Sequence, residues 1–425
     1  MCVAAFGKVI KLMGKNALVS FKGALKEVSV TLLPKVAIGD TVAVHAGFAT
    51  EIVKDPQKIY RDVVATDAYA RQLLDAIEKE NNRLQEPQLK IMNFCGTHEN
   101  TIAQYSLRDL LPPNIQLISG PGCPVCVTPE EEIAIGMKLA KSKNVILTTF
   151  GDLLRVPTRW GTLEQLRLEG IDIRMVYDIS QALDIAKTSQ SEVVHFAVGF
   201  ETTAPGTASV IQEAGNIDNF SIISSHRITP PAMEYVMLNS KMDILLCPGH
   251  VAMVIGTSPF DVLVKKYGIP SVISGFEPVD ILQAILQAMY HYGENQGSVI
   301  NQYERVVNEK GNELAQNLIN ETFTLKDADW RGVGILPESR LVLNSKYSRF
   351  DAEAKFGIQM PEKEEGTRQT CLCGEVLKGM KPQICPNFGK ECTPVNPAGP
   401  CMVTSEGACS IAYMNRYERN GFKYE

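Results

Sequence analysis

The cysteines of this chain are gathered near its carboxyl end. Six of the eleven lie between residues 371 and 409, in a stretch rich in glycine and proline. A chain of 425 residues, 45% of them apolar, can bury sizeable cores without a disulfide framework. Clustered cysteines in such a chain more often serve metal or redox chemistry. The six are Cys371, Cys373, Cys385, Cys392, Cys401 and Cys409.

This cysteine-rich segment can supply four thiolates to a [4Fe–4S] cluster, which needs soft ligands on a loop that wraps it. Zinc is the alternative, but the short paired CxxC knuckles usual for zinc are absent, which favours the cluster. The segment is also poor in periodic apolar residues, so we expect a metal to hold it. The predicted ligands are Cys373, Cys385, Cys392 and Cys409, and Cys371 and Cys401 are the alternatives within the same set.

Charge and hydropathy exclude two classes of protein. Lys and Arg number 42 against 48 Asp and Glu, a net charge of -6, and no dense basic stripe is present, which argues against a nucleic-acid binder. No apolar run reaches the roughly 18 residues of a membrane span, and the amino terminus lacks a secretory layout. We therefore expect a cytoplasmic protein that binds neither nucleic acid nor membrane.

The hydrophobic pattern changes three times along the chain. Short alternating stretches predict a small β-barrel over residues 1–58, and a helical repeat follows in a linker over 59–88. Apolar strands then alternate with helices over 89–335, which predicts an α/β body built from two similar parallel sheets. Beyond Trp330 the regular pattern fades, and 336–425 are expected to form an irregular iron–sulfur domain.

The first chemical motif of the body is Cys95-Gly96-Thr97-His98, directly after a predicted strand. Its thiol is expected at the carboxyl end of a strand and the amino end of a helix, the crevice in which open α/β sheets bind ligands. The helix dipole favours a thiolate there, and His98 could donate a hydrogen bond or carry a proton. A structural cysteine in a tight turn is the alternative.

The next turn carries a CxxC pair, Cys123 and Cys126, within the sequence GPGCPVC. A threonine, a proline and three glutamates follow it, which marks a helix start. Such a pair can form a reversible disulfide or bind metal transiently. Half of a zinc site is the competing interpretation, although no second CxxC supplies the other half.

A third turn, GFETTAP, places Glu201 and Thr202 after another strand. We expect these side chains to face the same crevice as the first two turns, so that one site holds three thiols, an imidazole and an acid. Ordinary turn chemistry explains this motif equally well. The same strand-then-glycine pattern recurs in CPGH and GFEP, residues 247–250 and 275–278.

The amino terminus offers one more thiol. Removal of Met1 would leave Cys2 first in the chain, on a free end beside an amine, and His45 could come near it across a small barrel. An incidental cysteine at the second position is an equal alternative.

Taken together, these motifs resemble a known family. CGTH, GPGCPVC, GFETTAP, PGHV, GFEP and the tail CGEVLKGMKPQICPNFGKECTPVNPAGPCMVTSEGAC, from about residue 66 onward, resemble the [NiFe]-hydrogenase maturation factor HypD. The first 58 residues, from MCVA to VHAGFA, look like its small partner HypC. HypC proteins usually carry a proline before the glycine of the amino-terminal motif, whereas in this chain Phe6 precedes Gly7.

The resemblance implies a scaffold on which iron receives two cyanides and one carbon monoxide before transfer to a hydrogenase large-subunit precursor. Cys2 and Cys95 would hold that iron, with His45 nearby. Cys123 and Cys126 would carry electrons or exchange disulfides, and the [4Fe–4S] cluster would supply reducing equivalents. Cyanide would come from a HypE-like donor, itself charged by a HypF-like carbamoyltransferase. Such a protein is an assembly scaffold rather than a conventional turnover enzyme.

Two other functions stay open on the sequence. One is an iron–sulfur thiol–disulfide oxidoreductase that works through Cys123 and Cys126 with no need of Cys2. The other is a zinc-stabilised interaction protein without catalysis.

Overall fold

The structure is a computed structural model that describes residues 5–21, 24–33, 35–45, 48–52, 64–294, 299–358 and 371–415. Contacts divide the chain into two units. One consists mainly of Met1–Asp67, the other of Ala68–Ala103 and Leu107–Arg416. We call them the barrel and the body and describe each by itself. The α/β class, the barrel and the cysteine-rich segment of the prediction are all confirmed.

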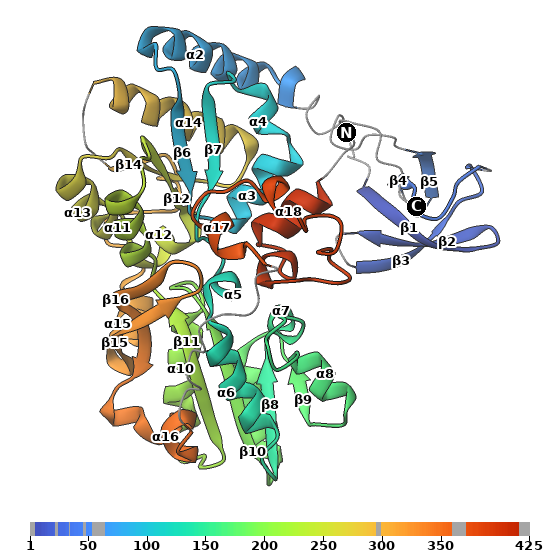
Figure 1. The fold of residues 1–425 in the computed structure, drawn as a ribbon, viewed down its shortest axis with the longest axis vertical. Helices are drawn as coiled ribbons and strands as arrows, with labels where there is room; N and C mark the ends of the chain where they lie inside the picture. Colours follow the sequence, from blue (N-terminus) through green and yellow to red (C-terminus); the bar gives the residue numbers. More distant parts are fainter. Residues whose placement is uncertain are drawn as a thin grey trace. The chain divides into compact units, whose positions relative to one another are not determined.

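The barrel closes five strands in the order β1-β2-β3-β5-β4 (Figure 1). Its inward side chains are mostly valines, among them Val9, Val19 and Val42, which alternate with exposed or half-buried residues. This period of two is what a sheet with one buried face requires. The strands are β1 (Ala5–Met13), β2 (Asn16–Phe21), β3 (Ala24–Ser29), β4 (Thr41–His45) and β5 (Phe48–Ile52).

The body contains two sheets, of which the first has five parallel strands in the order β14-β13-β12-β6-β7. Its central strands are buried along their length, as expected for a parallel sheet covered by helices. The strands are β6 (Leu89–Asn93), β7 (Ile115–Ser119), β12 (Ile244–Pro248), β13 (Ser271–Ser274) and β14 (Val299–Asn301). Helices α2 (Ala68–Leu84) and α14 (Pro278–Gly293) pack together over it.

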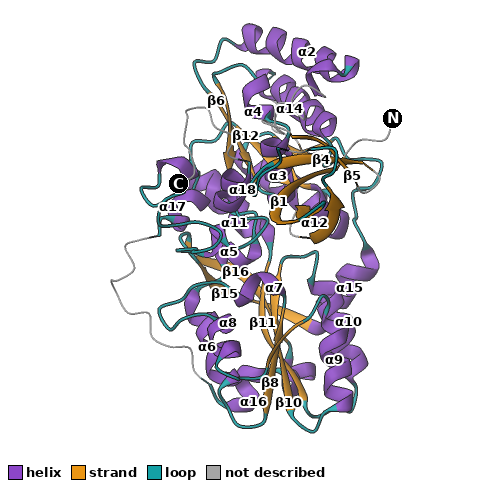
Figure 2. Ribbon diagram, turned by 90° about the vertical axis from the view of Figure 1, so that its right-hand side faces the viewer, coloured by secondary structure: helices purple, strands orange, loops and turns teal. Residues whose placement is uncertain are grey.

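The second sheet has six strands in the order β15-β16-β11-β10-β8-β9, the last four of them parallel. Figure 2 shows α6 on one face of this sheet and α9 and α10 on the other. The strands are β8 (Val145–Thr149), β9 (Ile173–Met175), β10 (Glu192–Gly199), β11 (Phe220–Arg227), β15 (Phe323–Trp330) and β16 (Gly334–Leu343).

The remaining helices connect and cover these sheets. None of the helices in the described part of the chain is long and apolar enough to cross a membrane. Their bounds are α3 (Gly96–Gln104), α4 (Leu107–Leu110), α5 (Pro124–Val127), α6 (Glu130–Ala140), α7 (Gly151–Leu154), α8 (Leu163–Leu168), α9 (Ile179–Thr188), α10 (Ala204–Ala214), α11 (Thr229–Asn239), α12 (Gly249–Ile255), α13 (Ser258–Tyr267), α15 (Glu313–Thr322) and α16 (Ala352–Phe356).

Two features differ from the sequence interpretation. The regular structure does not end at Trp330, because β15 and β16 form a hairpin that extends the second sheet through β11. Four consecutive residues of β15, 324–327, are exposed, so the sequence there does not alternate as a strand pattern should. The apolar pattern over residues 303–320 predicts a helix, but α15 (Glu313–Thr322) begins only after Asn312, whose side chain caps it.

The cysteine-rich segment folds into short helices within the body. These are α17 (Cys373–Leu377), α18 (Ala408–Met414) and the 3-10 turns η2 (Pro382–Ile384) and η3 (Pro400–Met402). A further 3-10 turn, η1 (Ser345–Phe350), precedes the segment. Four of its six thiols are buried in the same core as Cys123 and Cys126. Figures 1 and 2 both place α17 and α18 beside α3 and α5.

Candidate functional site

Cys95 lies at the junction predicted for it. It follows β6 and directly precedes α3, so its thiol stands at the carboxyl edge of the first sheet. The side chain of Asn93 fixes this turn: its amide donates to the Cys95 carbonyl at 2.8 Å, and its oxygen accepts from the Cys95 N–H at 3.1 Å. The turn is therefore held before any ligand arrives.

The thiol of Cys95 is buried, and its burial changes its pKa. Burial raises the pKa of Cys95 to about 11, while the N–H groups of His98 and Thr97 oppose the rise. The helix start thus favours the thiolate as predicted, but desolvation outweighs it. Without a ligand, this cysteine is a neutral thiol near pH 7.

His98 faces two other motifs of the chain. Its Nε2 lies 3.2 Å from the Ser274 carbonyl oxygen, and its ring lies 4.9 Å from that of Phe276, which stacks on His250 at 3.9 Å. CGTH, PGHV and GFEP therefore meet at the ends of β6, β12 and β13. Burial lowers the pKa of His98 to about 4, so the imidazole is neutral at pH 7.

The GPGCPVC turn packs directly on the Cys95 turn. It follows β7, the neighbour of β6 in the sheet. A Cβ on Gly122 would lie 2.6 Å from the Cys95 nitrogen, so only glycine permits this approach. The Cys126 N–H donates to the Cys123 sulfur at 3.2 Å, which caps α5. Both thiols are buried.

The CxxC pair also reaches the cysteine-rich segment. The thiols of Cys126 and Cys401 share a hydrogen bond, and Cys401 in turn contacts Cys373 and Cys409. Burial, followed by the Cys123 hydrogen bond, holds the pKa of Cys126 well above its ordinary value. The dithiol predicted for redox work and the thiols predicted for a metal thus form one continuous group.

The other thiols of the segment, those of Cys371, Cys385 and Cys392, gather around Cys373. The Cys371 and Cys373 sulfurs are 2.9 Å apart, and Cys392 interacts electrostatically with both and with Cys385. The Cys392 sulfur accepts the Ala398 N–H at 3.3 Å. Among the described residues, no group of three or more His, Cys, Asp or Glu side chains is arranged to hold a single metal ion.

The donor set suits a [4Fe–4S] cluster. All six thiols lie in or against one core, and the Ala398 N–H donates to the Cys392 sulfur, a kind of hydrogen bond that tunes such clusters. Gly399 lines this group closely, since a Cβ there would overlap the Cys371 sulfur and lie 2.7 Å from that of Cys373.

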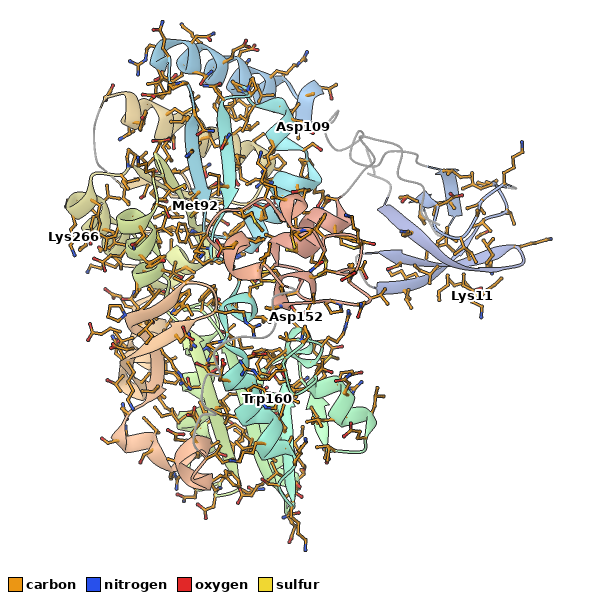
Figure 3. All side chains as sticks on the ribbon, viewed as in Figure 1. Lys11, Met92, Asp109, Asp152, Trp160 and Lys266 are labelled. Carbon is orange, nitrogen blue, oxygen red and sulfur yellow. The ribbon has the colours of Figure 1, made fainter. Side chains whose placement is uncertain are left out.

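Glu406 is a member of the site that the sequence interpretation missed. Gly96 lies against it, because a Cβ on Gly96 would be 2.6 Å from the Glu406 Cβ. Burial, reinforced by the charge of Asp152, raises the pKa of Glu406, whose own charge acts on Cys95. The neighbouring Thr404 hydroxyl donates to Asp152 at 2.7 Å, and Figure 3 shows Asp152 beside the cysteine-rich segment. Glu406 stands in the quoted tail motif, but no spacing linked it to Cys95.

The third predicted turn follows β10, in the second sheet. Phe200 shares the core of Cys123 and Cys126, so the turn does approach the dithiol. The Glu201 carboxylate, however, accepts from the Thr229 N–H at 2.6 Å and its hydroxyl at 2.9 Å, which caps α11. Burial raises the pKa of Glu201 to about 7, and Thr202 is exposed.

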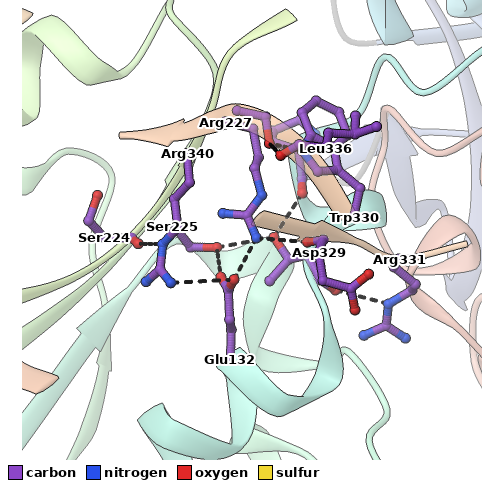
Figure 4. Close-up of polar contacts among 12 residues, drawn as sticks. Glu132, Ser224, Ser225, Arg227, Asp329, Trp330, Arg331, Leu336 and Arg340 are labelled. Atoms are coloured by element: carbon purple, nitrogen blue, oxygen red, sulfur yellow. Dashed lines mark hydrogen bonds and ion pairs between the residues drawn. The ribbon is translucent and has the colours of Figure 1, made fainter. Parts of the chain in front are cut away.

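A buried ionic network supports the helix that follows the dithiol (Figure 4). Glu132 on α6 pairs with Arg227, accepts the Ser225 hydroxyl at 2.6 Å and lies 3.7 Å from Arg340. The charges come from α6, β11 and β16, so the network ties the dithiol turn to the hairpin at the sheet edge. Removing one partner of such a network leaves a buried charge uncompensated.

Two predicted iron ligands belong to the barrel. Cys2 lies outside the described residues. His45 ends β4, opposite Phe48 of β5, and its side chain also lies outside the description. Their predicted approach to Cys95 stays a proposal.

Comparison with known proteins shows which families the two parts of this chain match. Residues 68–416 match the HypD model, described as the hydrogenase formation hypA family, and residues 1–58 match the HupF/HypC family. The body and its thiols thus define a hydrogenase maturation factor. The chain belongs to the HypD family and carries an amino-terminal HupF/HypC domain.

Curated relatives agree with this assignment. A putative hydrogenase expression/formation protein of Methanocaldococcus jannaschii is 42% identical over 354 residues, 82% of this chain and 98% of that protein. Hydrogenase maturation factor HypD of Cupriavidus necator is 42% identical over 336 residues, 76% and 88% of the two chains. HypD of Azotobacter vinelandii is 40% identical over 367 residues, 83% and 96%.

Proposed function

We propose that this protein is a scaffold for assembly of the Fe(CN)2CO group of a [NiFe]-hydrogenase. The observation that carries the proposal is the meeting of three elements in one body: the Cys95 turn, the Cys123–Cys126 dithiol and the cysteine-rich segment. Family membership supports the same role in hydrogenase maturation.

In this proposal Cys95 of the body and Cys2 of the barrel hold the iron that is assembled, with His45 as a nearby ligand. Thiolates are soft ligands suited to iron that carries cyanide and carbon monoxide. Because burial raises the pKa of Cys95 to about 11, iron binding must displace its proton. The neighbouring carboxyl of Glu406, whose pKa is also raised, lies close enough for its charge to act on Cys95 when the thiol loses its proton. Neutral His98 keeps this turn free of a competing cation.

The reductive part of the work falls to the dithiol and the segment beside it. When bound at Cys373, Cys385, Cys392 and Cys409, a [4Fe–4S] cluster would supply single electrons. Cys126 lies in contact with Cys401, and Cys401 contacts Cys373 and Cys409, so thiols link the predicted ligands to the dithiol. Burial of these thiols limits side reactions with external oxidants.

The partners follow from the same role. A HypE-like protein would donate cyanide, having received its carbamoyl precursor from a HypF-like carbamoyltransferase, and a hydrogenase large-subunit precursor would accept the finished group. Fusion of the HypC-like barrel makes one partner intramolecular and raises its effective concentration, provided that the linker permits docking.

The alternative is a thiol–disulfide oxidoreductase with an iron–sulfur cluster. The contact of Cys126 with the cysteine-rich segment favours it, because a dithiol beside a cluster can reduce a protein disulfide. This alternative needs neither Cys2 nor Cys95. Turnover of a disulfide substrate by a Cys95→Ala variant would favour it over the scaffold.

Metal analysis of the anaerobically purified full chain tests the proposal. We expect about four cluster irons with matching sulfide, plus further iron when the protein is expressed beside its maturation partners. Cys95→Ala should lose only the further iron. Cys247→Ala is the matched control, since this cysteine is equally buried in β12 of the same sheet but outside the site. Zinc without iron, or equal iron in both variants, would contradict the proposal.

A further inference from the structure

The turn between β15 and β16 lies against the cysteine-rich segment. Gly332 in this turn has φ of +76°, and a Cβ there would overlap the Cα of Gly374. Gly374 directly follows Cys373, the first residue of α17. Two glycines thus let one backbone touch another at a predicted cluster ligand.

Arg331 precedes that glycine and is fixed to the dithiol helix. Its N–H donates to the Val127 carbonyl at 2.8 Å, and its side-chain Nε donates to the Thr128 carbonyl at 2.9 Å. Val127 ends α5, one residue after Cys126. Figure 4 shows the Arg331 side chain beyond Asp329 and Trp330, held at its Nε. The guanidinium therefore has one fixed orientation.

One donor of this guanidinium has no partner among the described residues. The Arg331 Nη2 atom is buried and makes no hydrogen bond. A buried donor left unpaired is costly, so a protein rarely keeps one without a ligand. The fold holds this N–H in place through two backbone bonds and leaves it free for an acceptor.

The charge of Arg331 reaches the sulfur atoms of the cysteine-rich segment. The Arg331 charge acts on the Cys371 thiol, whose sulfur is 2.9 Å from that of Cys373. A thiolate or sulfide placed here would both neutralise the guanidinium and accept its free N–H.

We propose that Arg331 donates from Nη2 to a sulfur at the Cys371–Cys373 pair and thereby stabilises the reduced form of the cluster. This inference rests on the proposed [4Fe–4S] cluster. Reduction adds one electron, taken from an external reductant, and breaks no bond. The added negative charge is stabilised by a fixed cation and by hydrogen bonds to sulfur, which raise the reduction potential. Arg331 also contacts the end of α5, so it ties the dithiol to the cluster.

A redox titration of the anaerobically purified full chain tests this inference. Cluster reduction is followed by visible absorbance and electron paramagnetic resonance, with iron and sulfide assayed on each sample. At the wild-type midpoint potential, we expect Arg331→Gln to lower the ratio of reduced to oxidised cluster about tenfold, which is about 59 mV for a one-electron couple. Arg331→Lys keeps the charge but loses the planar donor, so its shift should be about threefold.

Arg349→Gln is the matched control, because it removes an exposed arginine that pairs with Asp218 away from the cysteines. It should titrate as the wild type. A cluster in Arg331→Gln with the wild-type ratio would overturn the inference and leave the proposed function standing. If that variant binds no cluster, the Lys variant decides: a lowered ratio supports the inference, and an unchanged one overturns it. Absence of iron and sulfide from the wild type would instead overturn the proposed cluster itself.

Discussion

Gly122 and Cys95 touch backbone to backbone. A side chain at Gly122 would lie 2.5 Å from the Phe94 carbonyl carbon and 2.6 Å from the Cys95 nitrogen. The two turns follow neighbouring strands, so the dithiol and the predicted iron ligand are held at one sheet edge. Through this one glycine, two thiols that are 28 residues apart in the chain, those of Cys95 and Cys123, belong to turns in direct contact.

Gly122→Ala should therefore damage the site. The new Cβ must push the two turns apart, and such overpacking costs about 1–3 kcal/mol. We expect a lower midpoint of thermal or denaturant unfolding and less iron bound at Cys95. Gly206→Ala in α10 is the control, because a Cβ there meets nothing within 4 Å and should be neutral or slightly stabilising. Equal stability of the two variants would contradict the close contact.

Loss of Glu132 should destabilise the body strongly. Burial alone would raise the pKa of Glu132, but the charges of Arg227 and Arg340 hold it below its usual range. Glu132→Gln leaves the fully buried Arg227 unpaired, which costs about 3–5 kcal/mol. Chemical denaturation at pH 7 measures the difference. Because this pKa is depressed, the contribution is present above about pH 4.3 and is lost at lower pH, so the two proteins should converge in acid.

His98 gives the body a second pH dependence, in a different window. Burial lowers its pKa to about 4, although the Ser274 carbonyl opposes that shift. Below about pH 6.5 the unfolded chain binds a proton that the folded chain refuses, so the free energy of unfolding falls by about 3 kcal/mol as pH falls from 6.5 to 4. His98→Gln should reduce this slope in denaturant titrations and leave the slope between pH 7 and 8 unchanged. The rest of the slope comes from the buried His195 and His226, whose pKa values burial lowers to about 3. An equally steep loss in the variant would exclude His98 as its source.

Alkylation should report the state of Cys95 directly. Only the thiolate reacts, and burial raises its pKa to about 11 in the folded protein against about 8.5 in an unfolded chain. In protein purified without the further iron, we expect modification of Cys95 by iodoacetamide at pH 8 to be at least about tenfold slower than in urea. The rate should rise with pH toward 11. Peptide mass spectrometry measures it, and equal rates in native and unfolded protein would contradict the burial.

The sequence was sufficient to place single motifs. The alternation of apolar residues identified the barrel and the body strands, and a strand followed by glycine placed Cys95 at a strand end. These features depend on neighbours in the chain, which is why a local pattern predicts them.

The grouping of motifs was not predictable in the same way. The chain passes from the first sheet to the second and back, so consecutive strands do not share one edge. CGTH consequently meets PGHV and GFEP, while Glu201, at the end of β10 in the second sheet, caps α11. The contacts of Glu406 with Gly96 and of Arg331 with Thr128 join residues more than 200 positions apart. Such contacts follow from tertiary packing, which no periodicity records.

The central claim is that iron with cyanide and carbonyl ligands is held by Cys95 together with Cys2. The most direct test is an infrared spectrum, in the cyanide and carbonyl stretching region, of the full chain purified anaerobically after expression with its maturation partners. We predict bands in the wild type and in Cys247→Ala, and their loss in both Cys95→Ala and Cys2→Ala with the cluster iron retained. Bands that persist in either of the last two variants would contradict the account.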